Sequence, residues 1–167
     1  GNLGPALVVA GETLHLYFTK KEGLQHRIHH ATSTDGTSWT APVLVEGLGS
    51  GSVVGLPSVH WTGERFRMWY GSGSIDLAES VDGATWTVVK TGTLMRGASG
   101  DFDSYSVLYP SAWTDASGVT LFFTGYDGSD YSIGRAVSND GQSFTRSPKA
   151  AVLVRGPAGS LDNRAVA

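Results

Sequence analysis

The chain has 167 residues, of which 40% are hydrophobic and 16% charged, and a mean hydropathy of -0.08, so it lacks the excess of charge that keeps chains disordered. A formal net charge of -3 and a pI near 5.9 exclude the basic field that recruits nucleic acid or an anionic membrane surface. No apolar run approaches the roughly 20 residues of a membrane span, and the absence of cysteine excludes disulfides and thiolate metal sites.

Each of three successive repeats is predicted to supply four strands. The innermost strand follows a proline, at Pro5, Pro57 and Pro110. An alternating, aromatic-rich run then predicts a second strand. A third strand carries an isoleucine and, three residues later, an alanine. The second strands are expected at 14–19, 66–70 and 119–124, and the third-strand pairs are Ile28 and Ala31, Ile75 and Ala78, and Ile133 and Ala136.

A short sequence motif of the form Ser-x-Asp-Gly-x-x-aromatic, which we call the phrase, follows each third strand, at 33–39, 80–86 and 138–144. Its first residues are 47 and then 58 residues apart (80 minus 33 and 138 minus 80), near the period of propeller blades. Asp-Gly between alternating segments predicts a hairpin with a type I′ turn. The fourth strand is expected to begin at the aromatic residue, and the recurrent alanine predicts close approach of neighbouring sheets.

These repeats predict an all-β fold of propeller blades, each of four antiparallel strands. We expect one domain over 1–167, with blades at approximately 4–55, 56–108 and 109–167. Three blades are fewer than the four to eight that close a propeller. We therefore expect either part of a longer propeller, because the sequence stops where another blade would begin, or a homodimer or other homo-oligomer that completes the ring.

The motif Ile-x-x-Ala-x-Ser-x-Asp-Gly-x-x-Trp, together with aromatic strands such as 121–126, resembles the blades of the five-bladed glycoside hydrolase propellers. These include arabinanases, β-xylosidases, invertase-like fructosidases and the related mannoside phosphorylases. The phrase is also similar to the sialidase Asp box but lacks the residue between Asp and Gly. Asp35, Asp82 and Asp140 are expected to be turn residues, because Asp side chains bond nearby backbone amides in such turns.

The resemblance implies a carbohydrate-active protein, but this sequence departs from the catalytic pattern of the family. Family members often place an Asp directly before the innermost proline, where this chain has Gly4, Leu56 and Tyr109. The family's general acid is commonly a Glu just ahead of an innermost strand, whereas Glu46 lies eleven residues before Pro57 (57 minus 46). Whether the chain is an enzyme therefore stays open.

The remaining acidic candidates lie in connections that return the chain toward the axis. Glycoside cleavage needs two carboxyl groups roughly 5 to 9.5 Å apart. Asp103 and Asp162 are the candidate catalytic pair, each followed four residues later by a valine. The alternative is that their recurrence reflects capping of the same loop between blades.

Candidate substrate-binding residues surround this pair: Asp101, Tyr105, Tyr109 and Arg164. Tyr109 could stack on a sugar ring or fill a blade interface. The adjacent His29 and His30 point to opposite faces of a strand, so solvated strand histidines are expected and no metal site or other cofactor is predicted.

Two functional hypotheses follow, with a carbohydrate ligand as the expected partner and neither nucleic acid nor membrane. In the first, the chain acts on glycosidic bonds, with acid and base drawn partly from sequence outside these residues. In the second, it is a non-catalytic sugar-binding or protein-binding propeller, or an assembling module without activity. The compartment is undetermined, with a secreted or periplasmic bacterial location slightly favoured. Gly1 starts directly in fold-like sequence without a signal peptide, and a leader could have been removed.

Overall fold

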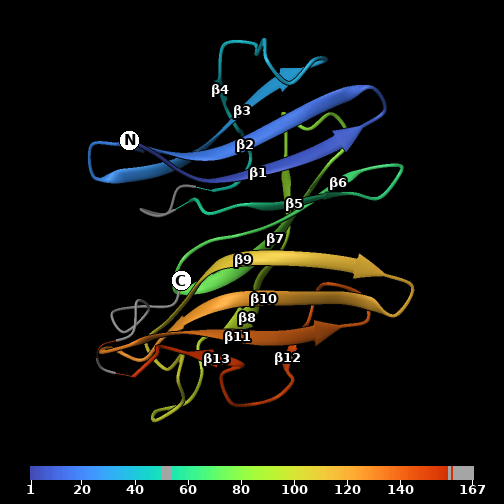
Figure 1. The fold of residues 1–167 in the computed structure, drawn as a ribbon. Helices are drawn as coiled ribbons and strands as arrows, with labels where there is room; N and C mark the ends of the chain where they lie inside the picture. The colour runs from blue at the N-terminus through green and yellow to red at the C-terminus, as the bar shows by residue number, and fades with distance from the viewer. Residues whose placement is uncertain (50–53, 158, 160–167) are drawn as a thin grey trace.

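The computed structural model describes residues 1–49, 54–157 and 159, which form three antiparallel sheets (Figure 1). Each sheet takes its strands in chain order. The first contains β1 (Asn2–Ala10), β2 (Thr13–Glu22), β3 (Gln25–Ser33) and β4 (Val43–Leu44). The second contains β5 (Ser58–Trp61), β6 (Phe66–Tyr70), β7 (Ser74–Ser80) and β8 (Thr87–Met95). The third contains β9 (Ser106–Asp115), β10 (Gly118–Tyr126), β11 (Tyr131–Ser138), β12 (Thr145–Arg146) and β13 (Leu153–Val154).

The all-β fold of three four-stranded blades is confirmed, and every second and third strand falls where the pattern predicts it. The register is also repeated, because each third-strand alanine lies opposite an apolar residue of the second strand. The blade limits stay a prediction, since β1 and β9 begin a few residues before positions 4 and 109.

The fourth strand is regular only in the second blade. In the first blade it is reduced to Val43–Leu44, directly after Pro42, which has no N–H to donate to a ladder. In the third blade Pro148 interrupts it, so β12 and β13 pair with different parts of β11. Proline therefore limits the pairing of the outermost strands.

The phrase forms the same loop in all three blades, and its Ser and Asp side chains accept hydrogen bonds from the backbone of that loop. In the second blade Asp82 Oδ1 accepts the N–H groups of Ala84 and Thr85, both at 2.8 Å, while Ser80 Oγ accepts that of Gly83 at 2.9 Å. These bonds lower the pKa of the Asp82 carboxyl. The predicted structural role is confirmed, but the type I′ hairpin is wrong, because Gly83 has positive φ and Asp82 does not.

Two hydrophobic cores lie between the sheets, one in each blade interface. The sheet of β5–β8 stands between the other two (Figure 1) and contributes one face to each core. Met68 and Ala78 belong to the core shared with the first blade, whereas Trp69 and Leu77 belong to the core shared with the third. The small third-strand residues Ala78 and Ala136 are fully buried there, in agreement with the predicted close approach.

One contact, which we call the interface contact, joins each blade to the next. An aromatic donor on the second strand binds the carbonyl oxygen of the phrase glycine of the following blade. Tyr17 Oη donates to Gly83 O at 2.8 Å, and Trp69 Nε1 donates to Gly141 O at 2.9 Å. The same geometry at both interfaces makes this contact a property of the repeat.

The prediction that His29 and His30 are solvated is wrong, because both are buried. His30 Nε2 lies 3.0 Å from His15 Nδ1, and its ring stacks on Tyr17. This histidine pair lies beside the Tyr17–Gly83 contact, so it belongs to the interface between the first two blades. Burial, together with the nearby His15, lowers the pKa of His30 to about 4.

Candidate functional site

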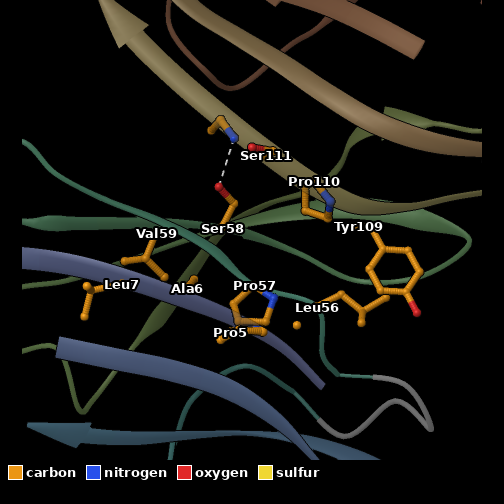
Figure 2. A pocket seen from close by; sticks show the side chains of 12 residues that line it. Pro5, Ala6, Leu7, Leu56, Pro57, Ser58, Val59, Tyr109, Pro110 and Ser111 are labelled. Carbon is orange, nitrogen blue, oxygen red and sulfur yellow. Dashed lines mark hydrogen bonds between the residues drawn. The ribbon is translucent and has the colours of Figure 1, made fainter. Parts of the chain in front are cut away.

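An open pocket lies where the innermost strands of the three blades converge (Figure 2). It has a volume of about 370 Å³ and takes four consecutive residues from each blade, 4–7, 56–59 and 109–112. β1 contacts β5, and β5 contacts β9. Because innermost strands surround the axis of a propeller, we call this the axial pocket.

The backbone at the entrance of the axial pocket is left-handed in all three blades. Gly4, Leu56 and Tyr109, each directly before a proline, have φ of 52°, 59° and 51°. Within the described part of the chain, Leu56 and Tyr109 are the only residues other than glycine with positive φ. Such a conformation costs about 1 to 3 kcal/mol, and a following proline disfavours it further. This strain marks the entrance as a constrained position rather than an ordinary turn.

Hydrogen bonds hold the three strands in place around the pocket. The N–H of Leu56 donates to Thr19 Oγ1 at 2.6 Å, which ties the entrance of the second blade to the first. Ser58 Oγ accepts the N–H of Ala112 at 2.9 Å, which ties the third blade to the second (Figure 2). The walls are therefore fixed by contacts between blades.

Among the described residues that line the axial pocket, none has a charged side chain. Tyr109, 43% exposed, lies at the same end as the aliphatic Leu56 (Figure 2). Among the described residues that line the pocket, none carries a carboxyl group. An aromatic face with hydroxyl and backbone groups can bind a sugar by stacking and hydrogen bonding, but it supplies neither the acid nor the base of glycoside cleavage.

A smaller pocket of about 220 Å³ shares Leu56 and Tyr109 with the axial pocket and adds His26 to its lining. The Nδ1 atom of His26 is buried and has no hydrogen-bond partner among the described residues. A buried polar atom of this kind normally finds a hydrogen-bond partner. No sequence motif indicates His26, because its position depends on the packing of three blades.

Asp103 lies away from the axial pocket and is fully buried. Its Oδ2 accepts a hydrogen bond from Arg146 Nε at 2.7 Å, and Arg146 also donates to the carbonyl of Met95 at 2.6 Å. The backbone carbonyl of Asp103 accepts the N–H of Gly97 at 3.1 Å. These contacts support the loop-capping alternative, and the catalytic role of Asp103 stays a prediction.

The other predicted residues occupy separate places. Asp101 accepts the N–H of Ala98 at 3.0 Å within its own loop. Tyr105 is exposed and packs edge-on against Tyr126, with ring centres 5.4 Å apart. Asp162 and Arg164 lie outside the described residues. Of the four predicted site residues that the structure describes, Tyr109 is therefore the one in the axial pocket.

In the described part of the chain, no group of three or more His, Cys, Asp or Glu side chains is arranged to hold a metal ion. Residues 1–49, 54–157 and 159 also include no helix with the length and apolarity needed to cross a membrane.

Neither protein-family models nor curated proteins match this sequence. Solved structures do match its fold. A glycosyl hydrolase from Bacteroides ovatus is 19% identical, with a TM-score of 0.77 over 95% of this chain and 54% of the hydrolase. A family 117 glycoside hydrolase of Zobellia galactanivorans is 16% identical, with a TM-score of 0.80 over 93% of this chain and 57% of the hydrolase. A β-1,2-mannobiose phosphorylase from Listeria innocua is 16% identical, with a TM-score of 0.70 over 89% and 44%.

The chain has the blade fold of the five-bladed propellers to which these glycoside hydrolases belong. It spans less than two thirds of their length, between 44% and 59%. At identities below 20% the similarity establishes the fold, while activity depends on the residues of the site.

Proposed function

We propose that these three blades belong to a carbohydrate-active β-propeller and that the axial pocket binds a sugar. The observation that carries this proposal is the strained, left-handed Tyr109, which holds a half-exposed aromatic ring at the axis of a fold used by glycoside hydrolases. Strained residues other than glycine persist where the surroundings hold them, and they cluster at functional sites. Stacking on an aromatic ring combined with hydrogen bonds is a suitable chemistry for a sugar.

In this proposal Tyr109 and Leu56 form the apolar wall, and the hydroxyl and backbone groups of the pocket lining form hydrogen bonds with the sugar hydroxyls. Tyr105, Asp101 and Arg164 remain candidates for contacts with more distant sugar units. Cleavage needs two carboxyl groups. Asp162 remains a candidate, whereas Asp103 would have to leave Arg146 before it could act.

A second candidate function is sugar binding without cleavage. It is favoured by the absence of carboxyl groups among the described residues that line the axial pocket. The two functions share the binding step and differ in whether sugar is released. A purely protein-binding role would not use Tyr109 as a sugar contact.

The test is isothermal titration with β-1,2-mannobiose, the sugar named for the Listeria innocua neighbour, followed by a panel of other disaccharides. The expected result is saturable binding that falls by tenfold or more in Tyr109→Ala, since loss of aromatic stacking costs about 1.4 kcal/mol or more. Tyr131→Ala, on the β10–β11 hairpin and outside the pocket lining, is the matched control. Binding to none of the sugars, or equal binding by both variants, would reject the proposal.

Release of sugar from aryl glycosides, measured alongside, separates the two candidates. Turnover that is lost in Asp162→Asn would support cleavage by this carboxyl group. Binding without turnover would support the non-catalytic alternative. Both candidate functions depend on how the ring is completed, by further blades or by another copy of the chain.

A further inference from the structure

Aspartate is followed directly by glycine at four places in this sequence, once in each phrase and once at 127–128, between β10 and β11. An aspartate before glycine can rearrange without an enzyme, because glycine has no side chain to shield its amide nitrogen from the aspartyl carboxyl. In a folded protein the rate depends on how the structure holds the two groups that must meet.

The four carboxyl groups are held alike. In each pair Oδ1 accepts the backbone N–H groups of the second and third residues after the aspartate. For Asp127 these donors are Ser129 and Asp130, both at 2.8 Å, as they are Ala84 and Thr85 for Asp82. These backbone bonds lower the pKa of all four carboxyls. The carboxyl groups therefore do not distinguish the four pairs.

The glycine nitrogens are held differently. In every phrase a serine two residues before the aspartate accepts the glycine N–H through its Oγ, at 2.8 Å in the first blade and 2.9 Å in the other two. The equivalent position before Asp127 is Gly125, which has no hydroxyl. In the described part of the chain, no group accepts the N–H of Gly128. A phrase amide must leave its serine before it can turn toward the carboxyl, whereas the Gly128 amide has no such bond to break.

Burial separates the three phrases from one another. Gly83 and Gly141 are buried, and a Cβ there would lie 2.7 to 2.9 Å from atoms of the preceding blade. Gly36 and Gly128 are exposed. Ring closure moves the glycine nitrogen, so a crowded glycine opposes it more strongly than an exposed one.

We propose that Asp127 is a modification site at which the chain converts its own aspartate to isoaspartate, while the phrase serine protects the other three pairs. The Gly128 nitrogen bonds to Asp127 Cγ, and the OH of the carboxyl, protonated from solvent, leaves as water with the amide hydrogen. Water then adds to the backbone carbonyl carbon of Asp127, breaks its bond to nitrogen and returns the hydrogen. The chain now runs through Cβ and Cγ, the α-carboxyl is free, and the composition is unchanged.

The rearrangement adds one methylene to the backbone of the turn between β10 and β11. It also moves the carboxyl group that accepts the N–H groups of Ser129 and Asp130. Tyr126 and Tyr131, which flank the turn, stack with ring centres 4.5 Å apart. We expect hydrogen exchange at Ser129 and Asp130 to quicken after conversion. This inference does not depend on sugar binding.

The first test is prolonged incubation of the 167-residue chain at neutral pH, in buffer and in urea. Mass spectrometry of its peptides, with fragmentation that distinguishes isoaspartate from aspartate, gives the conversion at each pair. The four rates should be similar in urea. In buffer, relative to urea, Asp127 should convert fastest and Asp35 about two- to tenfold more slowly, the equivalent of one hydrogen bond. Asp82 and Asp140 should be slowest. If Asp127 were protected as well as Asp35, the proposal would be overturned.

The second test removes the serine from the exposed phrase. Ser33→Ala should raise the conversion of Asp35 in buffer about two- to tenfold and leave it unchanged in urea. Ser38→Ala is the matched control in the same loop, because only the backbone N–H of Ser38 bonds Asp35. Asp82 and Asp140 in the same samples report whether each variant stays folded. An equal rise at Asp35 in the two variants would show that the serine does not protect.

Asp127→Glu tests the assignment of the site. Its longer side chain would have to close a six-membered ring, so isoaspartate formation at 127 is lost. Isoaspartyl methyltransferase with labelled S-adenosylmethionine measures total isoaspartate in the folded protein. The label should fall to the level contributed by the three phrases. Undiminished labelling would place the isoaspartate elsewhere and overturn the proposal.

Discussion

The hydroxyl of Tyr17 on the first blade donates a hydrogen bond to the carbonyl oxygen of Gly83 on the second, at 2.8 Å and out of contact with water. Gly83 O also accepts the Trp86 indole N–H at 3.1 Å. The Gly83 carbonyl thus accepts one hydrogen bond from within its own loop and one from the neighbouring blade. Since the interblade hydrogen bond recurs between Trp69 and Gly141, its energetics describe how blades of this design hold together.

Tyr17→Phe removes the donor and keeps the ring. We expect a loss of about 1 kcal/mol in the free energy of unfolding, because Gly83 O retains the bond from Trp86 and is not left unsatisfied. Urea unfolding followed by fluorescence measures the change. Tyr105→Phe, on an exposed tyrosine, is the control and should change stability by less than about 0.5 kcal/mol. Equal losses in the two variants would contradict a role for the interblade bond.

The three phrase glycines allow the cost of crowding an interface to be separated from the cost of backbone strain. Gly36, Gly83 and Gly141 have similar φ of 74°, 77° and 71°, so alanine strains each backbone alike. A Cβ on Gly83 or Gly141 meets atoms of the preceding blade at 2.7 to 2.9 Å, and on Gly36 it has room.

Gly36→Ala should therefore cost about 1 to 2 kcal/mol, the penalty of a left-handed alanine. Gly83→Ala and Gly141→Ala should cost about 1 to 3 kcal/mol more, as overpacked sites do. Denaturant unfolding of the three variants gives the comparison directly. If Gly36→Ala were as destabilising as the other two, the first phrase would already be covered in the 167-residue chain.

Substitution of Asp103 distinguishes a structural role of its carboxylate from a catalytic role. Because it is fully buried and bonded to Arg146, Asp103→Asn should destabilise the protein by about 2 to 4 kcal/mol, as does removal of one partner of a buried pair. Arg146→Met should do the same, and the double variant should lose less than the sum of the two.

The matched control is Asp130→Asn, whose carboxylate forms an exposed ion pair with Arg155 at 3.1 Å and should cost less than about 1 kcal/mol. A stable Asp103→Asn protein that binds sugar but releases none would instead restore the catalytic assignment of Asp103.

The buried histidine pair predicts that stability depends on pH. Burial, and then the neighbouring His15, lowers the pKa of His30 from 6.5 to about 4. Below pH 6.5 the unfolded chain takes up a proton that the folded protein does not, so folding is opposed increasingly as the pH falls toward 4. Stability should therefore be constant above about pH 7 and decline by on the order of 2 kcal/mol toward pH 4.5.

Urea midpoints at pH 7.5, 6.0 and 4.5 measure this decline, a range that stays above the titration of the phrase aspartates, whose pKa values lie below 3.8. His30→Phe should make the profile shallower, with a remaining slope from His15 and His60, whose pKa values burial also lowers. His29→Gln, which leaves the His15–His30 pair intact, should keep the full slope. An unchanged slope in His30→Phe would place the main titrating group elsewhere.

The sequence predicts the blades well because their signals are local and repeated. A proline, an alternating aromatic run, an alanine and a Ser-x-Asp-Gly loop recur in order, and each acts within about ten residues of its own strand. One local error, the type I′ turn, arises because the Asp82 carboxylate accepts hydrogen bonds from the following amides while Asp82 itself does not adopt positive φ.

The site is predicted less well because it depends on contacts between blades. Nothing near Asp103 in the sequence indicates that Arg146, 43 residues later, neutralises it. The burial of the His15–His30 pair and of the His26 nitrogen that has no hydrogen-bond partner likewise depends on neighbouring sheets. Tyr109 is indicated by the sequence as an aromatic residue at an innermost strand, but its left-handed backbone is not predicted.

Tyr109→Gly distinguishes a functional tyrosine from a structural one. Glycine adopts positive φ without penalty, so this variant relieves strain of about 1 to 3 kcal/mol, while loss of a half-exposed ring removes little packing. We expect an unfolding free energy equal to or above that of the parent chain, together with a loss of sugar binding of tenfold or more.

Leu56→Gly is the matched control at the equivalent position of the second blade. Its side chain is buried, so the lost burial and the cavity left behind, about 2 to 5 kcal/mol, equal or exceed the relief of strain, and the protein should be no more stable than the parent chain. Differential scanning calorimetry and sugar titration on the same samples give both quantities. A Tyr109→Gly protein that is less stable yet binds sugar normally would show that the ring supports the third blade and that the strain serves no binding function.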